Sequence, residues 1–288
     1  AYYDVNAKSI LSFEGQYLYK TQDPFYGLMT ETQLVGTPFS DTASLTQDRL
    51  IKTNKIDGLF SYYYILNNKN HVEFSLGGSY TDQSLNSNFL QAYGDTLFTI
   101  SDSLRSNDVK FQLTDIVASV HYRTKLGKLT VKPGVNLHRY STNNLQYDES
   151  LDRNWNFVLP DFFAKYDFKK SQSLTLDYKM TANFTDVNQV ASGVILQNYN
   201  SLFTGNPYLD NAIYHNVSMR FFSFNLFNFT NIFAFVNYNK KIDEITNAVN
   251  YIGIDRVNSP INSTAANDAV TGSLSYQRRI KVYKVTAR

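Results

Sequence analysis

The sequence predicts an all-β fold, namely an antiparallel transmembrane β-barrel of about ten strands that forms a portion of a larger barrel. Three observations predict it. Apolar and polar side chains alternate over long segments, tight turns alternate with long polar connections, and aromatic residues are abundant, with 22 Tyr and 21 Phe among 288 residues. The apolar stretches are interrupted by Ser, Asn or Thr, so none reaches the length of about 20 residues that a membrane-spanning helix needs.

The alternating segments are the signal for strands, because successive side chains of a strand point to opposite faces. They run for about 10–14 residues, more than the 5–6 residues of an ordinary strand and enough for a tilted membrane-spanning strand of about 9–11 residues. The ten spans lie around 11–19, 54–66, 71–81, 116–122, 128–138, 156–168, 173–185, 211–224, 228–241 and 270–276.

Each segment has two chemically different faces. A charge at the lipid midplane costs about 2–4 kcal/mol, so the apolar faces are predicted to contact lipid and the polar faces to line the lumen. The predicted lipid contacts are Leu129, Val131, Val135, Leu174, Leu176, Met180, Ala182 and Leu274. The predicted lumen-side charges are Glu14, Asp57, Glu73, Asp115, Asp161, Lys165, Asp177, Lys179 and Arg220, as ordinary polar lining or as groups that act in conduction or plug docking.

The connections support the same fold. Tight turns are predicted at 67–70, 126–127, 169–172, 225–227 and near 280–282, and long connections at 21–53, 83–109, 142–155, 186–210 and 242–266. Outer-membrane barrels have short periplasmic turns and long extracellular loops. The single domain 1–288 is therefore expected to be an outer-membrane barrel segment. Residues 283–288 read as the start of a further strand, so the segment is expected to be incomplete, without a plug or an N-terminal domain.

Catalytic, cofactor and metal sites are not expected. The sequence has no Cys, and its four histidines lie in four different predicted strands without a metal-binding spacing. No nucleophile elbow, P-loop or dinucleotide fingerprint is present. The net charge of +2 and the scattered Lys and Arg residues argue against nucleic acid as a partner. Residues 1–4 do not read as a signal peptide.

The long loops are the predicted contact segments, because the strand faces are committed to lipid and lumen. Aromatic rings among hydrogen-bonding side chains suit sugars, siderophores or protein partners. The candidate ligand or partner contacts are Phe25, Tyr26, Tyr93, Phe98, Tyr199, Phe203, Tyr208 and Tyr251. The alternative is that these rings only pack the loops against each other.

Several segments resemble a known family. Residues 205–210 read Gly-Asn-Pro-Tyr-Leu-Asp and precede Tyr-His-Asn-Val at 214–217. This element, together with segments 156–160, 174–178 and 237–245, resembles the barrel region of the Bacteroidetes-type outer-membrane β-barrel family, relatives of the TonB-dependent receptors. The resemblance is clearest over roughly residues 155–280.

The resemblance implies a bacterial outer-membrane barrel that binds a nutrient and imports it through a plugged barrel. Its partners would be outer-membrane lipid, a plug domain and TonB in the full-length protein, and a surface lipoprotein. Two alternatives stay open: a non-transporting barrel that acts as a surface scaffold or interaction protein, and a passive pore. The sequence predicts no enzymatic activity, because the catalytic motifs named above are absent, and the strands do not record the substrate.

Overall fold

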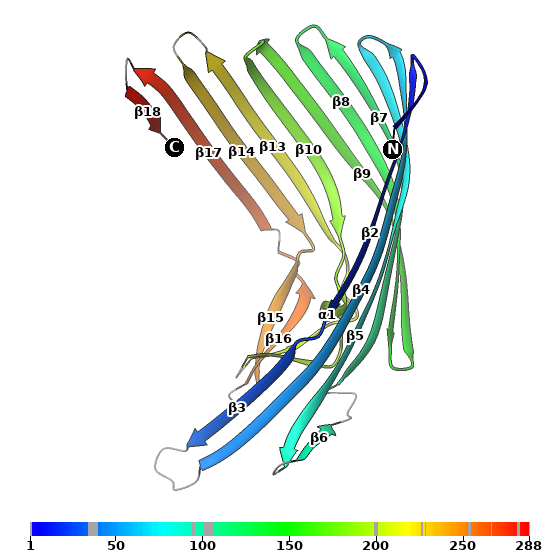
Figure 1. Cartoon of the computed structure of the whole chain (residues 1–288), viewed down its shortest axis with the longest axis vertical. Helices are drawn as coiled ribbons and strands as arrows, with labels where there is room; N and C mark the ends of the chain where they lie inside the picture. Colours follow the sequence, from blue (N-terminus) through cyan, green and yellow to red (C-terminus); the bar gives the residue numbers. More distant parts are fainter. Residues whose placement is uncertain are drawn as a thin grey trace.

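The computed structural model is all-β (Figure 1) and describes residues 2–33, 40–93, 96–100, 106–198, 201–225, 227, 229–252, 255–265, 267–280 and 283–287. Among these residues the only helix is α1 (Val187–Val190), a single turn. No described helix is long and apolar enough to cross a membrane. The absence of a long helix and the dominance of strands confirm the predicted fold class.

One large antiparallel sheet dominates the molecule. Its strand path runs β1-β2-β4-β5-β7-β8-β9-β10-β13-β14-β17-β18. Off this path, β3 pairs with the first residues of β4 and β6 pairs with the last residues of β5. The strands are β1 (Tyr2–Asn6), β2 (Ser9–Gln22), β3 (Phe25–Gln33), β4 (Ser40–Asn67), β5 (Asn70–Tyr93), β6 (Thr96–Ile100), β7 (Asn107–Leu126), β8 (Leu129–Gln146), β9 (Glu149–Lys169), β10 (Gln172–Asn183), β13 (Ala212–Asn225), β14 (Thr230–Ile242), β17 (Asn267–Ile280) and β18 (Tyr283–Ala287). Ten of these strands occupy the ten predicted spans.

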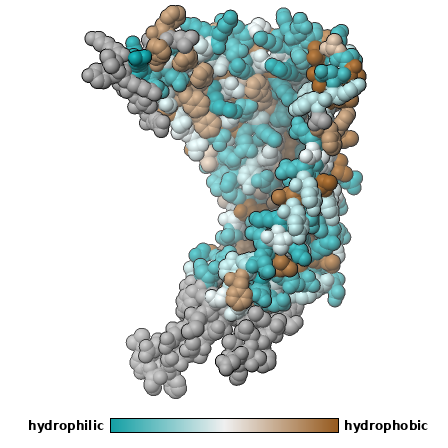
Figure 2. Space-filling model, in the orientation of Figure 1, coloured by the Kyte–Doolittle hydropathy of each residue, from teal (hydrophilic) through white to brown (hydrophobic). Residues whose placement is uncertain are grey.

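The sheet is curved around a hollow (Figure 1), and its two faces differ in chemistry. We call the face that contacts α1 the inner face and the opposite face the outer face. The eight predicted lipid contacts all share the outer face; for example, Leu129, Tyr166, Leu174 and Phe221 are successive cross-strand partners. Apolar side chains also line the right-hand margin of the upper half in Figure 2. The predicted separation of the apolar set from the charged set onto opposite faces of the sheet is therefore confirmed.

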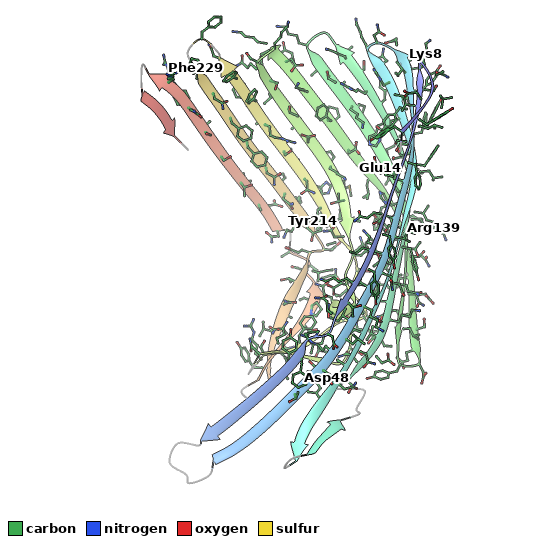
Figure 3. The ribbon with its side chains drawn as sticks, viewed as in Figure 1. Lys8, Glu14, Asp48, Arg139, Tyr214 and Phe229 are labelled. Carbon is green, nitrogen blue, oxygen red and sulfur yellow. The ribbon has the colours of Figure 1, made fainter. Side chains whose placement is uncertain are left out.

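All nine predicted lumen-side charges share the inner face. Glu73, His121, Gly134 and Asp161 are successive partners across β5, β7, β8 and β9. In Figure 3, Glu14 lies on the side of the hollow, whereas Arg139 projects from the outer face. The inner face therefore carries the charge that the period-two pattern assigns to a lumen.

The four internal tight turns lie where they are predicted, at the top of Figure 1. Gly127 supports one of them with a φ of 61°, which side chains other than glycine rarely adopt. The predicted long loop 142–155 is wrong, because β8 and β9 continue to Gln146 and Glu149 and leave only Tyr147 and Asp148 between them. Beyond the apolar band both faces of a strand can be polar, so the lost alternation does not mean a lost strand.

The other long connections also contain structure. β4 and β5 extend far into the predicted loops 21–53 and 83–109. The loops 186–210 and 242–266 form α1 and a second sheet in the order β11-β12-β16-β15, made of β11 (Val194–Asn198), β12 (Ser201–Thr204), β15 (Ile245–Ile252) and β16 (Asp255–Asn262). β12 and β16 pair in parallel, so the expectation of antiparallel neighbours throughout is wrong for this pair.

We call the large sheet the wall. The main buried core lies between the loops 186–210 and 242–266 and this wall. It consists of Leu85, Val109 and Phe111 from β5 and β7 and of Val187, Val190, Ala191, Ile195 and Phe203 from the loop 186–210. Apolar burial is thus concentrated at the loop end, where the second sheet and α1 cover the inner face. Over the outer face, lipid takes the place of a protein core.

Candidate functional site

The described residues of the loops 186–210 and 242–266, which include α1, β11, β12, β15 and β16, form one unit, which we call the platform. It lies in the hollow of the curved sheet, away from the tight turns (Figure 1). In an outer-membrane barrel the end opposite the short turns faces the cell exterior. The platform therefore lies toward the end of the sheet that would face the cell exterior in such a barrel.

Helix α1 fixes one end of the platform to the wall. The side chain of Asp186 caps it by accepting hydrogen bonds from the backbone N–H groups of Asn188 (2.9 Å) and Gln189 (3.1 Å). The N–H of Val187 donates to Gln83 of β5 over 3.1 Å. Val187 and Val190 are buried in the core against the wall, so the polar cap and the apolar face both hold the turn in place.

The Gly-Asn-Pro-Tyr-Leu-Asp element has a structural reason for its glycine and asparagine. A Cβ atom at Gly205 would lie 2.6 Å from the carbonyl oxygens of Ala191 and Gln189, which is too close for any side chain. The N–H of Gly205 donates to the Ala191 carbonyl over 2.8 Å. Asn206 Oδ1 accepts a hydrogen bond from the N–H of Tyr208 over 2.9 Å and so closes the turn around Pro207.

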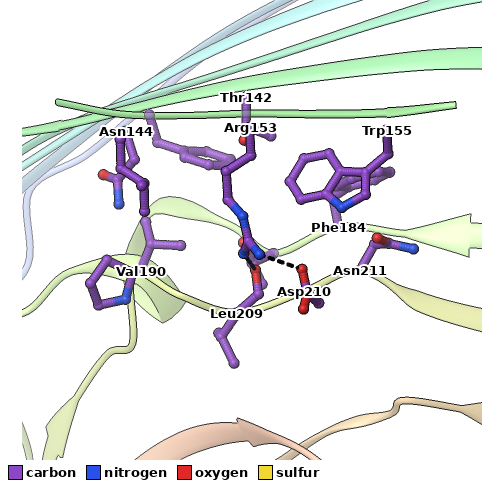
Figure 4. A pocket seen from close by; sticks show the side chains of 13 residues that line it. Thr142, Asn144, Arg153, Trp155, Phe184, Val190, Leu209, Asp210 and Asn211 are labelled. Atoms are coloured by element: carbon purple, nitrogen blue, oxygen red, sulfur yellow. Dashed lines mark hydrogen bonds and ion pairs between the residues drawn. The ribbon is translucent and has the colours of Figure 1, made fainter.

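Arg153 of β9 clamps this element to the wall (Figure 4). One guanidinium nitrogen donates to the carbonyls of Tyr208 (3.1 Å) and Leu209 (2.9 Å), and the other pairs with Asp210 over 2.7 Å. The space around this clamp measures about 20 Å³, which admits a single water molecule at most. The clamp is therefore a packed joint and not a ligand pocket.

Asn262 joins the two loops of the platform. Its Oδ1 accepts from the N–H of Asp210 over 2.8 Å, and its Nδ2 donates to the carbonyls of Asp210 (2.9 Å) and Asp243 (3.1 Å). The Asn262 side chain thereby forms hydrogen bonds with backbone groups at the end of the first loop and at the start of the second. The two loops are bound to each other as well as to the wall.

Two buried amide side chains of the wall complete the attachment. Gln47 Nε2 donates to the carbonyl of Val194 over 2.8 Å, and its Oε1 accepts from the N–H of Leu196 over 2.8 Å. Asn107 Oδ1 accepts from the N–H of Gly193 over 2.8 Å. Gln47 thus pairs with β11 as a neighbouring strand would.

The structure separates the eight predicted contact residues. Tyr208 and Tyr251 lie on the platform with 72% and 73% of their surfaces exposed, and Phe25 and Tyr26 are exposed on β3. Phe203 is buried at 7% exposure in the core, so for this ring the packing alternative holds. Only the backbone of Tyr93 and Phe98 is described, in β5 and β6, and Tyr199 lies outside the described residues.

The residues that hold the platform were not predicted from the sequence: Gln47, Asn107, Arg153 and Asn262. They stand in polar stretches where side chains are ordinarily solvated, and their partners are up to 149 residues away, as for Gln47 and Leu196. The only local signal was the Gly-Asn-Pro element, which marks one partner of Arg153 but not Arg153 itself.

Nearer the tight turns, ionisable groups of the inner face are paired. His121 Nε2 and Asp161 Oδ2 are 2.8 Å apart, His138 Nδ1 and Asp115 Oδ1 are 2.9 Å apart, and Lys132 donates to Glu73 over 2.8 Å. Within the described ranges no group of three or more His, Asp or Glu residues is arranged to hold a metal ion. The His138–Asp115 pair joins neighbouring strands, and the other two pairs each reach across one intervening strand.

Comparisons with known proteins agree with this architecture. The model of the outer membrane protein beta-barrel family matches residues 5–282. No curated protein matches the sequence. Among solved structures, the ferric yersiniabactin uptake receptor FyuA from Yersinia pestis is similar with a TM-score of 0.60 and 11% identity, over 98% of this chain and 39% of that chain.

Two further receptors give the same result. The ferric-catecholate import receptor Fiu from K12 E. coli has a TM-score of 0.60 at 10% identity, over 98% of this chain and 44% of that chain. The unliganded ferric citrate transporter FecA has a TM-score of 0.57 at 10% identity, over 96% and 37%. At such identities the likeness concerns the fold, and the chain spans about two fifths of the length of these receptors.

Proposed function

Because the chain belongs to the outer membrane protein β-barrel family, we propose that it is the barrel region of a TonB-dependent-receptor-like transporter. Such a transporter binds a nutrient at its loop end and imports it through a plugged barrel. The chain lies in the bacterial outer membrane, with its apolar outer face against lipid. Its role in this proposal is binding and passage of the nutrient, without catalysis.

The observation that carries the proposal is the platform on the inner face. It is fixed to the wall by Arg153, Gln47 and Asn107, and it presents the exposed rings of Tyr208 and Tyr251. Rings on a rigid support bind a ligand without first losing conformational freedom, and this supports binding. Placement on the lumen side directs a bound ligand toward the interior.

The partners follow from the same proposal. The paired charges of the inner face, such as Glu73 with Lys132, suit contact with a polar plug domain, and the energy for import would arrive by way of TonB. A surface lipoprotein would meet the loop end. The similar structures are receptors or transporters for ferric yersiniabactin, ferric catecholates and ferric citrate. They support transport as the activity class without naming a substrate here.

Uptake by whole cells tests the proposal. A strain that lacks the full-length gene is complemented with the wild type, with the double variant Tyr208→Ala and Tyr251→Ala, or with the outer-face control Tyr276→Ala. Mass spectrometry follows the depletion of amino acids, peptides, sugars and ferric siderophores from a defined mixture. At least one compound should be depleted by the wild type and the control but not by the double variant, and a protonophore should stop its depletion.

The two alternatives give different results. A surface scaffold predicts that no compound depends on the gene. A passive pore predicts gene-dependent depletion that a protonophore leaves unchanged. Either result would contradict energised import and would leave the fold and the location as they are.

A further inference from the structure

The platform sheet has two edge strands, and they differ in how their backbone is satisfied. β11 is short, has an irregular register between Leu196 and Asn198, and pairs with the side chain of Gln47. β15 forms the other edge and, in the part of the chain that the structure describes, pairs only with β16. One edge of the sheet is thus closed by the wall, and among the described residues no strand pairs with the other edge, which we call the open edge.

The register shows which groups of β15 face outward. In an antiparallel pair, hydrogen-bonded and non-hydrogen-bonded residue pairs alternate. The N–H of Ser263 donates to the Glu244 carbonyl over 2.8 Å, and Pro260, which has no N–H, stands opposite Asn247. Residues 246, 248, 250 and 252 therefore bond to β16, and residues 245, 247, 249 and 251 direct their N–H and C=O groups to the open edge.

This edge lacks the features that keep natural edge strands from pairing. Such strands are ordinarily protected by Lys, Pro, a bulge or shortness. β15 has eight residues, Ile-Thr-Asn-Ala-Val-Asn-Tyr-Ile, without a charge or a proline, and its register with β16 is unbroken. Val249 and Tyr251 are 38% and 73% exposed, and β-branched and aromatic residues favour cross-strand pairing.

We propose that the open edge of β15 binds an extended peptide ligand by strand addition. The backbone of the ligand pairs with residues 245, 247, 249 and 251, and its alternate side chains pack beside Val249 and Tyr251. The inference rests on the proposed receptor function, for which it names the ligand class. Main-chain pairing tolerates many side chains, so the site accepts a family of extended uncharged segments rather than one sequence.

Binding to the full-length protein in detergent tests the proposal without TonB or a membrane potential. The probe is a fluorescent pool of octapeptides in which Thr alternates with randomised Val, Ile, Tyr or Phe. Its control is the same pool N-methylated at four consecutive residues, which removes backbone donors and keeps every side chain. The unmodified pool should bind at least about tenfold more tightly, the effect of about 1.4 kcal/mol of main-chain pairing.

Protein variants separate the backbone from the side chain. Val249→Pro removes an outward N–H but no bond to β16 and should weaken binding about tenfold, whereas Val249→Ala keeps the N–H and should stay within about threefold. Asn247→Pro replaces Val249→Pro if that variant loses its heat-resistant mobility in detergent gels. Equal binding by the Pro and Ala variants, or of both peptide pools, overturns the proposal.

Hydrogen exchange gives a test that does not depend on variants. The amides of residues 247, 249 and 251 should exchange rapidly in the free protein and slowly once the unmodified pool is added. Slow exchange in the free protein would mean that another segment already occupies the edge, and that result overturns the proposal. Peptide binding without energised uptake would contradict the transport function and leave the peptide site standing.

Discussion

Replacement of Arg153 by Met should release the Gly-Asn-Pro element from the wall. Methionine keeps much of the aliphatic stem but loses two hydrogen bonds to the carbonyls of Tyr208 and Leu209 and the ion pair with Asp210. The barrel strands should be unaffected, because none of these three partners lies in the main sheet. The expected effect is local opening of the turn around Pro207.

The magnitude follows from the exposure of the partners. Hydrogen bonds that involve a charged group contribute about 1.5–3 kcal/mol, and the Arg153 side chain is 29% exposed. The Asp210 side chain is 53% exposed, so its ion pair is worth about 0.5–1 kcal/mol. We therefore expect a cost of about 2–3 kcal/mol for Arg153→Met and of about 0.5–1 kcal/mol for Asp210→Asn.

Amide hydrogen exchange of the full-length protein in detergent measures this opening. The N–H groups of Tyr208 and Asp210 are protected by Asn206 and Asn262 and report on the turn. Exchange should accelerate about 30- to 140-fold in Arg153→Met and about two- to fivefold in Asp210→Asn, at about 1.4 kcal/mol for each factor of ten. Equal acceleration in both variants would mean that the ion pair holds the turn, and no acceleration in either would refute the clamp.

Three other perturbations test the wall and its ends. Gly134→Ala places a Cβ 2.1 Å from the His121 imidazole and should lower the free energy of unfolding by about 1–3 kcal/mol, measured by denaturant titration. The control Gly58→Ala meets nothing within 4 Å and should leave the free energy of unfolding unchanged. Equal changes in the two variants would refute the packing of the His121 imidazole over Gly134. Leu176→Arg should impair barrel assembly in detergent gels more than Thr175→Arg, by about 2–4 kcal/mol at the lipid midplane, and equal effects would contradict the assignment of faces. Hydrogen bonds from Lys241 and Asn267 lower the pKa of the Glu244 carboxyl. The stability that this carboxylate adds to the folded state is therefore fully present above the ordinary pKa of about 4.3 and is lost as the pH falls through the lowered pKa. Hydrogen exchange at the β14–β15 junction should therefore rise below about pH 4 in the wild type but not in Glu244→Gln, and an identical acid response would contradict the pairing.

The strand spans and the two faces could be predicted from the sequence because each depends on local spacing. Successive side chains of a strand, such as Leu174 and Thr175, point to opposite faces, so an apolar face and a polar face give an alternating sequence. This pattern does not depend on the rest of the chain. The tight turns were predictable for the same reason, since a turn such as that at Gly127 depends on neighbouring residues alone.

Prediction failed where the alternation ended. Residues 142–155 are largely polar on both faces because this part of the wall extends beyond the apolar band, so the sequence predicts a loop where β8 and β9 are still paired. Among the predicted contact rings, Phe203 and Tyr208 are both aromatic loop residues five positions apart. Only the fold of the loop onto Leu85 and Val109 decides that the first is buried and the second exposed.

The sequence by itself determined that this chain forms a strand-rich wall with a lipid face and a polar inner face, because the physical cost of misplacing a charge in lipid is recorded residue by residue. Only the tertiary structure decided that the long loops fold inward into a platform. That arrangement depends on contacts such as Gln47 with Val194 and Arg153 with Asp210, which join residues 147 and 57 positions apart. No local pattern encodes such pairs, because each partner alone is an ordinary polar residue that water would satisfy equally well.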